Sequence, residues 1–126
     1  MSFEVGASQP LRALHSLPWG TEAERQPHEH DYRIEVVVER GTLDDRGVVC
    51  DLDVLRAGLD ELLGRLEGRD LDEIRPADAD GVTVELLARW LHESLADVVR
   101  RAGGETLAIR VWEAPDAFGG YRAGVV

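Results

Sequence analysis

The sequence lacks the features that define several large classes of protein. Cys50 is the single cysteine among 126 residues, which excludes an internal disulfide and a disulfide-stapled secreted fold. There is no run of about 18 apolar residues that could cross a membrane as a helix. The first nine residues carry neither the basic flank nor the apolar centre of a secretion signal. We therefore predict a soluble cytoplasmic protein.

Basic residues are also few. The chain has 14 Lys+Arg against 25 Asp+Glu, a formal charge of −11, so a partnership with nucleic acid or an anionic membrane surface is not expected. The content of 44% hydrophobic and 31% charged residues is typical of a globular protein rather than a disordered one. A chain of this length fits a single domain over residues 1–126, with a core large enough to need no staple.

The pattern of apolar residues predicts an α+β fold with the order β-β-α-α-β-β. The predicted elements are an extended segment around 11–15, a strand over 30–40, a helix from Asp51 or Asp53 to near Gly68, a helix from Thr83 to Gly103, and strands over 107–113 and 121–126. A long loop is expected from Pro18 to Pro27 and a turn from Pro115 to Gly120. Because strands and helices are segregated, we expect an antiparallel sheet with both helices on one face. Its open edges favour assembly of several copies.

Three of the four histidines form the strongest chemical pattern. His28 and His30 point to one face if their segment is extended, and His15 lies on the preceding extended segment. Three neutral imidazoles from adjacent strands make a zinc site with an open fourth position. The alternative, ordinary loop and strand-edge histidines, stays open on spacing alone. His92 is expected on an exposed face of the second helix.

Five segments together resemble the 6-pyruvoyl-tetrahydropterin synthase family, which includes the 6-carboxy-tetrahydropterin synthases. They are His15–Pro18, His28–His30, Gly47–Asp51, Thr83–Trp90 and Val111–Pro115. The resemblance implies a tunnelling fold in which subunits join their sheets into a barrel, as trimers stacked into hexamers, with active sites between subunits. It also implies zinc held by His15, His28 and His30 next to a reduced pterin triphosphate.

The same resemblance assigns substrate contacts. Glu113 matches the family's glutamate that clamps the amino group and ring N–H of the pterin, a geometry that suits a carboxylate accepting two parallel bonds. An exposed acid at the end of a strand is the alternative. Thr83 is placed near the ring, although its role as a helix N-cap explains it equally well.

The chain departs from the family where the family keeps its proton-transfer groups. The catalytic cysteine, four residues before the His-x-His pair, is replaced by Glu24, and the Asp-His pair by Glu67 and Gly68. Glu24 is therefore the candidate base, which resembles a variant of the family that cleaves the side chain, and Glu67 the candidate orienting group or proton shuttle. Exposed loop and helix-end acids are the alternatives, and Asp70 and Asp72 lie nearby. Cys50 is interpreted as a small buried hydrophobic residue.

Three functions compete at this point. The first is a zinc-dependent lyase that acts on the side chain of a reduced pterin, such as 7,8-dihydroneopterin triphosphate, with altered catalytic residues. The second is a pterin- or purine-binding paralogue with a different reaction or none, because Gly68 removes a proton-transfer group. The third is an oligomeric scaffold without enzymatic activity, for which replacing His28 would change nothing. We favour the lyase because the three histidines and Glu113 are all present.

Overall fold

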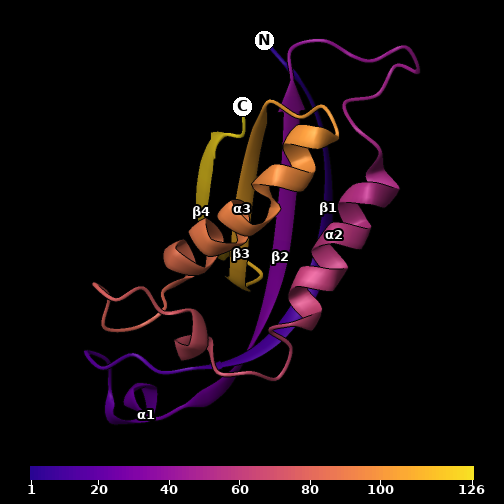
Figure 1. Cartoon of the computed structure of the whole chain (residues 1–126). Helices are drawn as coiled ribbons and strands as arrows, with labels where there is room; N and C mark the ends of the chain where they lie inside the picture. The colour runs from indigo at the N-terminus through magenta and orange to yellow at the C-terminus, as the bar shows by residue number, and fades with distance from the viewer.

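Four antiparallel strands form one sheet whose spatial order, β1-β2-β3-β4, follows the order of the chain (Figure 1). The computed structural model describes all 126 residues. The strands are β1 (Phe3–His15), β2 (His28–Arg40), β3 (Thr106–Ala114) and β4 (Ala117–Gly124). The helices are α1 (Glu22–Arg25), α2 (Leu52–Gly64), the 3₁₀ helix η1 (Leu71–Ile74) and α3 (Val84–Arg101). The predicted order of strands and long helices is confirmed. The short helix α1 lies in the segment from Pro18 to Pro27 that was expected to be a loop, and η1 lies between α2 and α3.

The core lies between the sheet and the two long helices, which both cover the same face (Figure 1). Alternate residues of β2 point into it, and Tyr32, Ile34, Val36 and Val38 are buried. The leucines of α2 and α3 meet them from the other side. Each fully buried Val or Leu contributes about 1.5–3 kcal/mol relative to an exposed side chain, so this layer holds the sheet in register. None of the helices is both long and apolar enough to span a membrane.

The N-caps predicted from the sequence fix where the long helices begin. Asp51 caps α2 by accepting hydrogen bonds from the N–H groups of Asp53 (2.9 Å) and Val54 (3.4 Å). Thr83 caps α3 in the same way, with its hydroxyl accepting from the N–H of Leu86 at 3.2 Å. A cap of this kind contributes about 1 kcal/mol. The expected role of Thr83 as an N-cap is confirmed, and its predicted place near the pterin ring stays a prediction.

The chain after α2 runs beside the end of β1. The expected helix end near Gly68 was wrong, because α2 ends at Gly64 and a series of turns follows. Gly68 has a φ of 72°, which favours glycine, and its N–H donates to the carbonyl of Arg12 at 2.8 Å. The N–H of Leu14 donates in turn to the carbonyl of Arg69 at 2.9 Å. These bonds cover the outer edge of β1 next to His15.

The expected turn from Pro115 to Gly120 was also wrong, because β4 already begins at Ala117. The glycines were misread as turn residues. A Cβ on Gly119 would lie 2.4 Å from Cγ2 of Val84, and a Cβ on Gly120 would lie 2.7 Å from the carbonyl oxygen of Ile109. Gly119 therefore serves close packing of β4 against the start of α3, and Gly120 close approach to β3.

His92 is buried, contrary to the expectation that it is exposed. Its Nε2 lies 3.2 Å from the carbonyl oxygen of Ala123 on β4, and its ring meets the ring of Tyr121 edge-on at 5.0 Å. The buried face of α3 is wider than the leucine spacing suggested, because the helix packs across both β3 and β4. His92 is a structural residue that fastens α3 to the edge strand.

Candidate metal centre

The β1–β2 ladder extends beyond the end of β3 and carries the three histidines. Arg33 of β2 is the last residue paired with β3, opposite Trp112, whereas β1 and β2 stay paired as far as His15 opposite His28. His30 lies two residues from His28, so the alternation of a strand places both rings on the same face as His15. The projecting ribbon therefore presents all three imidazoles on the side of the sheet that the helices cover.

The three rings converge on one point. The ring centroids of His15 and His28 are 4.5 Å apart, those of His15 and His30 5.3 Å, and those of His28 and His30 6.5 Å. One nitrogen of each ring lies within 4.8 Å of the nitrogens of the other two. Three imidazole nitrogens brought this close together form a donor set that could hold one metal ion. The sequence prediction that these residues come together is borne out by their positions.

The hydrogen bonds of the three imidazole rings leave one nitrogen of each ring available to bind a metal ion. Nδ1 of His28 lies 3.0 Å from the carbonyl oxygen of Gln26, and Nε2 of His30 lies 3.1 Å from that of Glu113. A nitrogen that donates to a carbonyl fixes the tautomer and leaves the other nitrogen of the ring as a metal ligand. Nδ1 of His15 is buried and has no hydrogen-bond partner. An unpartnered buried nitrogen is costly unless something binds it.

The environment of His15 keeps its ring neutral. Burial lowers the pKa of His15 below its usual value, and the neighbouring His28 and His30 lower it further. The backbone of Val82 and the carboxylate of Asp70 oppose this shift more weakly. Neutral imidazole is the form that binds a metal ion. Val82, which precedes the N-cap of α3, and Asp70, which caps η1, therefore both lie close to His15.

Tyr32 packs against the cluster, which the sequence did not predict. Its ring lies 4.7 Å from that of His30 and 6.0 Å from that of His15, centroid to centroid. Burial raises the pKa of the Tyr32 hydroxyl, and the carboxylate of Glu113 adds to the effect, so the phenol stays protonated. The signal was present in the sequence, because Tyr32 continues the alternation of His28 and His30 on the same face.

Glu113 lies next to the histidines at a β-bulge near the end of β3. Its side chain is exposed and lines a groove of about 710 Å³ together with Tyr32, Arg33 and Trp112. None of the three histidines lines this groove, and its β2 residues Asp31, Arg33 and Glu35 alternate with His28 and His30 along the strand. Glu113 is near the histidines through its backbone carbonyl, which contacts His30, and its carboxylate acts on Tyr32 beside the cluster.

The two candidate acids of the proton-transfer machinery lie in different places. Glu24 lies in α1, on the loop that joins His15 to His28, and its carboxylate is hydrogen-bonded to Thr21. It does not belong to the three-imidazole cluster. Glu67 accepts a hydrogen bond from the backbone N–H of Arg12 at 3.2 Å, on the edge of β1. Asp70 is the acid whose charge acts on His15, while its side chain caps η1.

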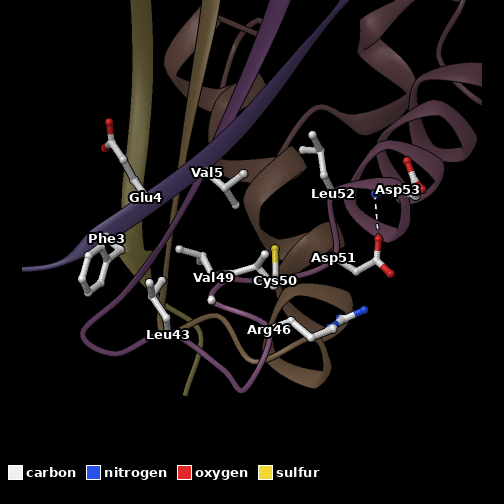
Figure 2. A pocket seen from close by; sticks show the side chains of 12 residues that line it. Phe3, Glu4, Val5, Leu43, Arg46, Val49, Cys50, Asp51, Leu52 and Asp53 are labelled. Atoms are coloured by element: carbon white, nitrogen blue, oxygen red, sulfur yellow. Dashed lines mark hydrogen bonds between the residues drawn. The ribbon is translucent and has the colours of Figure 1, made fainter.

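A second groove lies at the opposite end of β1 and holds no comparable set of groups. Figure 2 shows Phe3, Val5 and Leu43 around it, with the sulfur of Cys50 among apolar side chains and Asp51 bonded to the N–H of Asp53. Cys50 is 5% exposed, and burial raises the pKa of its thiol. The prediction of a buried, structural cysteine is confirmed.

Comparison with known proteins defines the class to which this fold and site belong. The family model of 6-pyruvoyl tetrahydropterin synthase matches residues 4–124. A protein of Pyrococcus horikoshii assigned as a 6-carboxy-5,6,7,8-tetrahydropterin synthase is 30% identical over a match that covers 72% of this chain and 71% of the relative. The chain therefore belongs to the 6-pyruvoyl tetrahydropterin synthase family.

Solved structures share the fold at low sequence identity. The 6-pyruvoyl tetrahydropterin synthase of Caenorhabditis elegans is 20% identical, with a TM-score of 0.74 over 98% of this chain and 96% of that one. A variant of the Plasmodium vivax enzyme, with a catalytic glutamate replaced by cysteine, is 9% identical, with a TM-score of 0.74 over 98% of this chain and 99% of that one. These similarities identify the four-stranded sheet and its helices as the fold of the family.

Proposed function

We propose that this protein is a metal-dependent lyase that acts on the side chain of a reduced pterin such as 7,8-dihydroneopterin triphosphate. The observation that carries the proposal is the cluster of three imidazoles, one nitrogen of each within 4.8 Å of the others, beside Glu113. Membership of the family supports a pterin substrate and a lyase reaction. Residues 1–126 act as one domain in this proposal.

His15, His28 and His30 would hold the metal ion, and a set of three neutral imidazoles favours zinc. Bound zinc supplies a Lewis acid that polarises a substrate oxygen. Other residues of the chain would bind and orient the substrate. Glu113 binds the ring of the substrate by accepting its N–H groups, while the protonated hydroxyl of Tyr32 lies on the same side of the cluster.

Glu24 is the base in this proposal and removes a proton from a side-chain carbon of the substrate. Two observations support it. Glu24 lies on the connection between the ends of β1 and β2 that carry the histidines, and it is half-buried although its neighbours in α1 are exposed. The structurally similar Plasmodium vivax enzyme has a glutamate among its catalytic residues. Glu67 would act only at a distance, by holding the edge of β1.

Incubation of the protein with 7,8-dihydroneopterin triphosphate tests the proposal directly. The protein loaded with one equivalent of zinc is expected to consume the compound, and the same protein treated with a chelator is not. Chromatography of the pterins measures both. A protein that holds one zinc ion per chain and leaves the compound unchanged contradicts the proposed reaction.

Replacing Glu113 with glutamine is expected to raise KM for the pterin about 10- to 100-fold, because the neutral amide loses the charge-assisted bonds to the ring. Metal content should stay the same, since the backbone carbonyl of residue 113 still accepts from His30. Steady-state kinetics and metal analysis measure the two effects. Asp116→Asn, on the adjacent turn, is the matched control. An unchanged KM would remove Glu113 from the site.

Metal retention is expected to fall as the pH is lowered from about 7 to 5. The unfolded chain takes up protons on histidine near pH 6.5, whereas burial lowers the pKa of His15 in the folded protein. The contribution of neutral His15 to stability is therefore present above about pH 6.5 and is lost as the pH falls through the lowered pKa. Protons also compete with the metal for all three rings. Equilibrium dialysis followed by metal analysis checks this, and a constant metal content over this range contradicts three-imidazole ligation.

A pterin-binding protein with a different reaction, or with none, is the second candidate. The observation that favours it is Gly68, which stands where the family has its acid–base histidine and has a φ of 72° that side chains rarely adopt. No other histidine takes that place, because His92 is bound to Ala123 on the far edge of the sheet. Tight pterin binding by calorimetry without turnover would select this candidate over the lyase.

The exposed edges of the sheet support assembly into a closed barrel of several subunits, as trimers or hexamers. Residues 3–10 of β1 have no partner on their outer edge, because the chain around Gly68 covers only the region from Arg12 to Leu14. The outer edge of β4 is unpaired as well. Joining these edges between copies removes both. Sedimentation equilibrium at micromolar concentration is expected to give three or six chains per particle, and a monomer contradicts this assembly.

A further inference from the structure

The carboxylate of Glu24 is hydrogen-bonded to Thr21, the residue that precedes α1. The hydroxyl of Thr21 donates a hydrogen bond to Oε1 of Glu24 at 3.2 Å and accepts one from the backbone N–H of Glu24 at 3.3 Å. One hydroxyl thus binds both ends of the same residue, which a single donor hydrogen and two lone pairs allow. The side chain of Glu24 is turned back toward the loop instead of extending into solvent.

Gly20 makes room for this arrangement. A Cβ built on Gly20 would lie 2.5 Å from Oε2 of Glu24, 2.7 Å from its Cβ and 3.1 Å from its Cδ. The φ of Gly20 is not in the left-handed region, so its backbone conformation does not require glycine. Glycine is required here because the Glu24 side chain occupies the space that a Cβ would need. Any larger residue at position 20 must push the carboxylate away from its place.

Backbone hydrogen bonds tie this loop to the ends of both histidine-bearing strands. The carbonyl of Glu24 accepts from the N–H of Leu17 at 2.7 Å, and the N–H of Gly20 donates to the carbonyl of Leu17 at 3.0 Å. Leu17 follows His15 by two residues, and Glu24 precedes His28 by four. The backbone at Glu24 is therefore fixed relative to the end of β1, which carries His15.

We propose that Gly20 and Thr21 are positioning residues that hold the carboxylate of Glu24 in one orientation for proton transfer. The inference rests on the proposed function, in which Glu24 is the base. Without the hydroxyl of Thr21, the Glu24 side chain gains rotamers that point into solvent, so the fraction of molecules with a correctly placed base falls. This loss lowers kcat and leaves the binding of pterin and metal unchanged.

The test compares Thr21→Val, which keeps the shape of the side chain, with Thr21→Ser, which keeps the hydroxyl. For the zinc-loaded protein and 7,8-dihydroneopterin triphosphate, we expect Thr21→Val to lower kcat about tenfold with KM within about twofold. Thr21→Ser should restore kcat. Gly20→Ala should lower kcat like Thr21→Val, because the new methyl group displaces the carboxylate. Metal analysis and the melting temperature identify any variant that fails to fold.

A double-mutant cycle separates positioning from a structural role. In a Glu24→Gln background, Thr21→Val is expected to cause no further loss of kcat, because its effect acts through the carboxylate. The same tenfold loss in that background, or equal kcat for Thr21→Val and Thr21→Ser, overturns the inference while leaving the proposed function intact. Full activity of Glu24→Gln overturns the role of Glu24 and the inference with it. If the parent protein does not turn over this compound, crystal structures decide: the carboxylate must leave its place in Thr21→Val and keep it in Thr21→Ser, and an unmoved carboxylate in Thr21→Val overturns the inference.

Discussion

Replacing His28 with alanine is expected to abolish retention of the metal ion and, with it, turnover of the pterin. His28 already uses Nδ1 to donate to the carbonyl of Gln26, so its ring is oriented and Nε2 is left for the ion. Two imidazoles that remain hold a divalent ion far more weakly than three, and we expect affinity to fall at least about 100-fold. Metal analysis after dialysis, together with the pterin assay, measures both losses.

His92→Gln is the matched control, because His92 is the single histidine outside the cluster. It should keep its metal ion, although its stability falls because the bond to the carbonyl of Ala123 is disturbed. A His28→Ala protein that retains one ion per chain after dialysis shows that the three imidazoles do not form the site. Full activity in that variant would favour a scaffold role for the protein.

Replacing Glu24 with glutamine is expected to lower kcat by about 10²- to 10⁴-fold, the usual contribution of a general base. The amide keeps the size of the side chain and still accepts the hydrogen bond from Thr21, so its position is preserved. Metal content and KM should stay close to those of the parent protein, because Glu24 is outside the three-imidazole cluster. Single-turnover kinetics on the zinc-loaded protein isolate the chemical step from product release.

Glu22→Gln provides the comparison for this variant, since Glu22 lies in the same short helix with an exposed side chain. It removes the same charge and should leave kcat within about twofold, as expected for an exposed surface acid. If Glu24→Gln and Glu22→Gln behave alike, then Glu24 is a surface acid. The base must in that case be sought among the acids close to His15, of which Asp70 is the first.

Most of the fold could be predicted because its elements carry strong local patterns. The alternation from Tyr32 to Val38 and the leucine spacing of α2 and α3 each match one period, and the capping residues Asp51 and Thr83 mark helix starts. The errors in the predicted elements lie where tertiary contacts determine the local structure. Gly119 indicated a turn in the sequence, yet it lies in β4. The residue is glycine because the start of α3 leaves no room for a side chain there.

The candidate site was predictable to the extent that it depends on strand geometry. The shared face of His28 and His30 follows from alternation once their strand is recognised, whereas the register that places His15 opposite His28 depends on the loop between the strands. The contacts around the imidazole rings could not be predicted from strand geometry. The carbonyl of Glu113 reaches His30 from a residue 83 positions away, and Gly20 meets Glu24 through a fold of the loop. Spacing in the sequence does not encode such contacts, because they depend on loop conformation.

In the proposed function, three imidazoles on the β1–β2 ribbon would hold one divalent ion next to Glu113. X-ray absorption spectroscopy of the purified, zinc-loaded protein tests it most directly, combined with anomalous diffraction at the zinc edge. We predict one zinc ion per chain, bound by nitrogens of His15, His28 and His30 at about 2.0–2.1 Å. A zinc ion bound elsewhere on the chain, or three rings turned apart with no ion between them, would contradict the account.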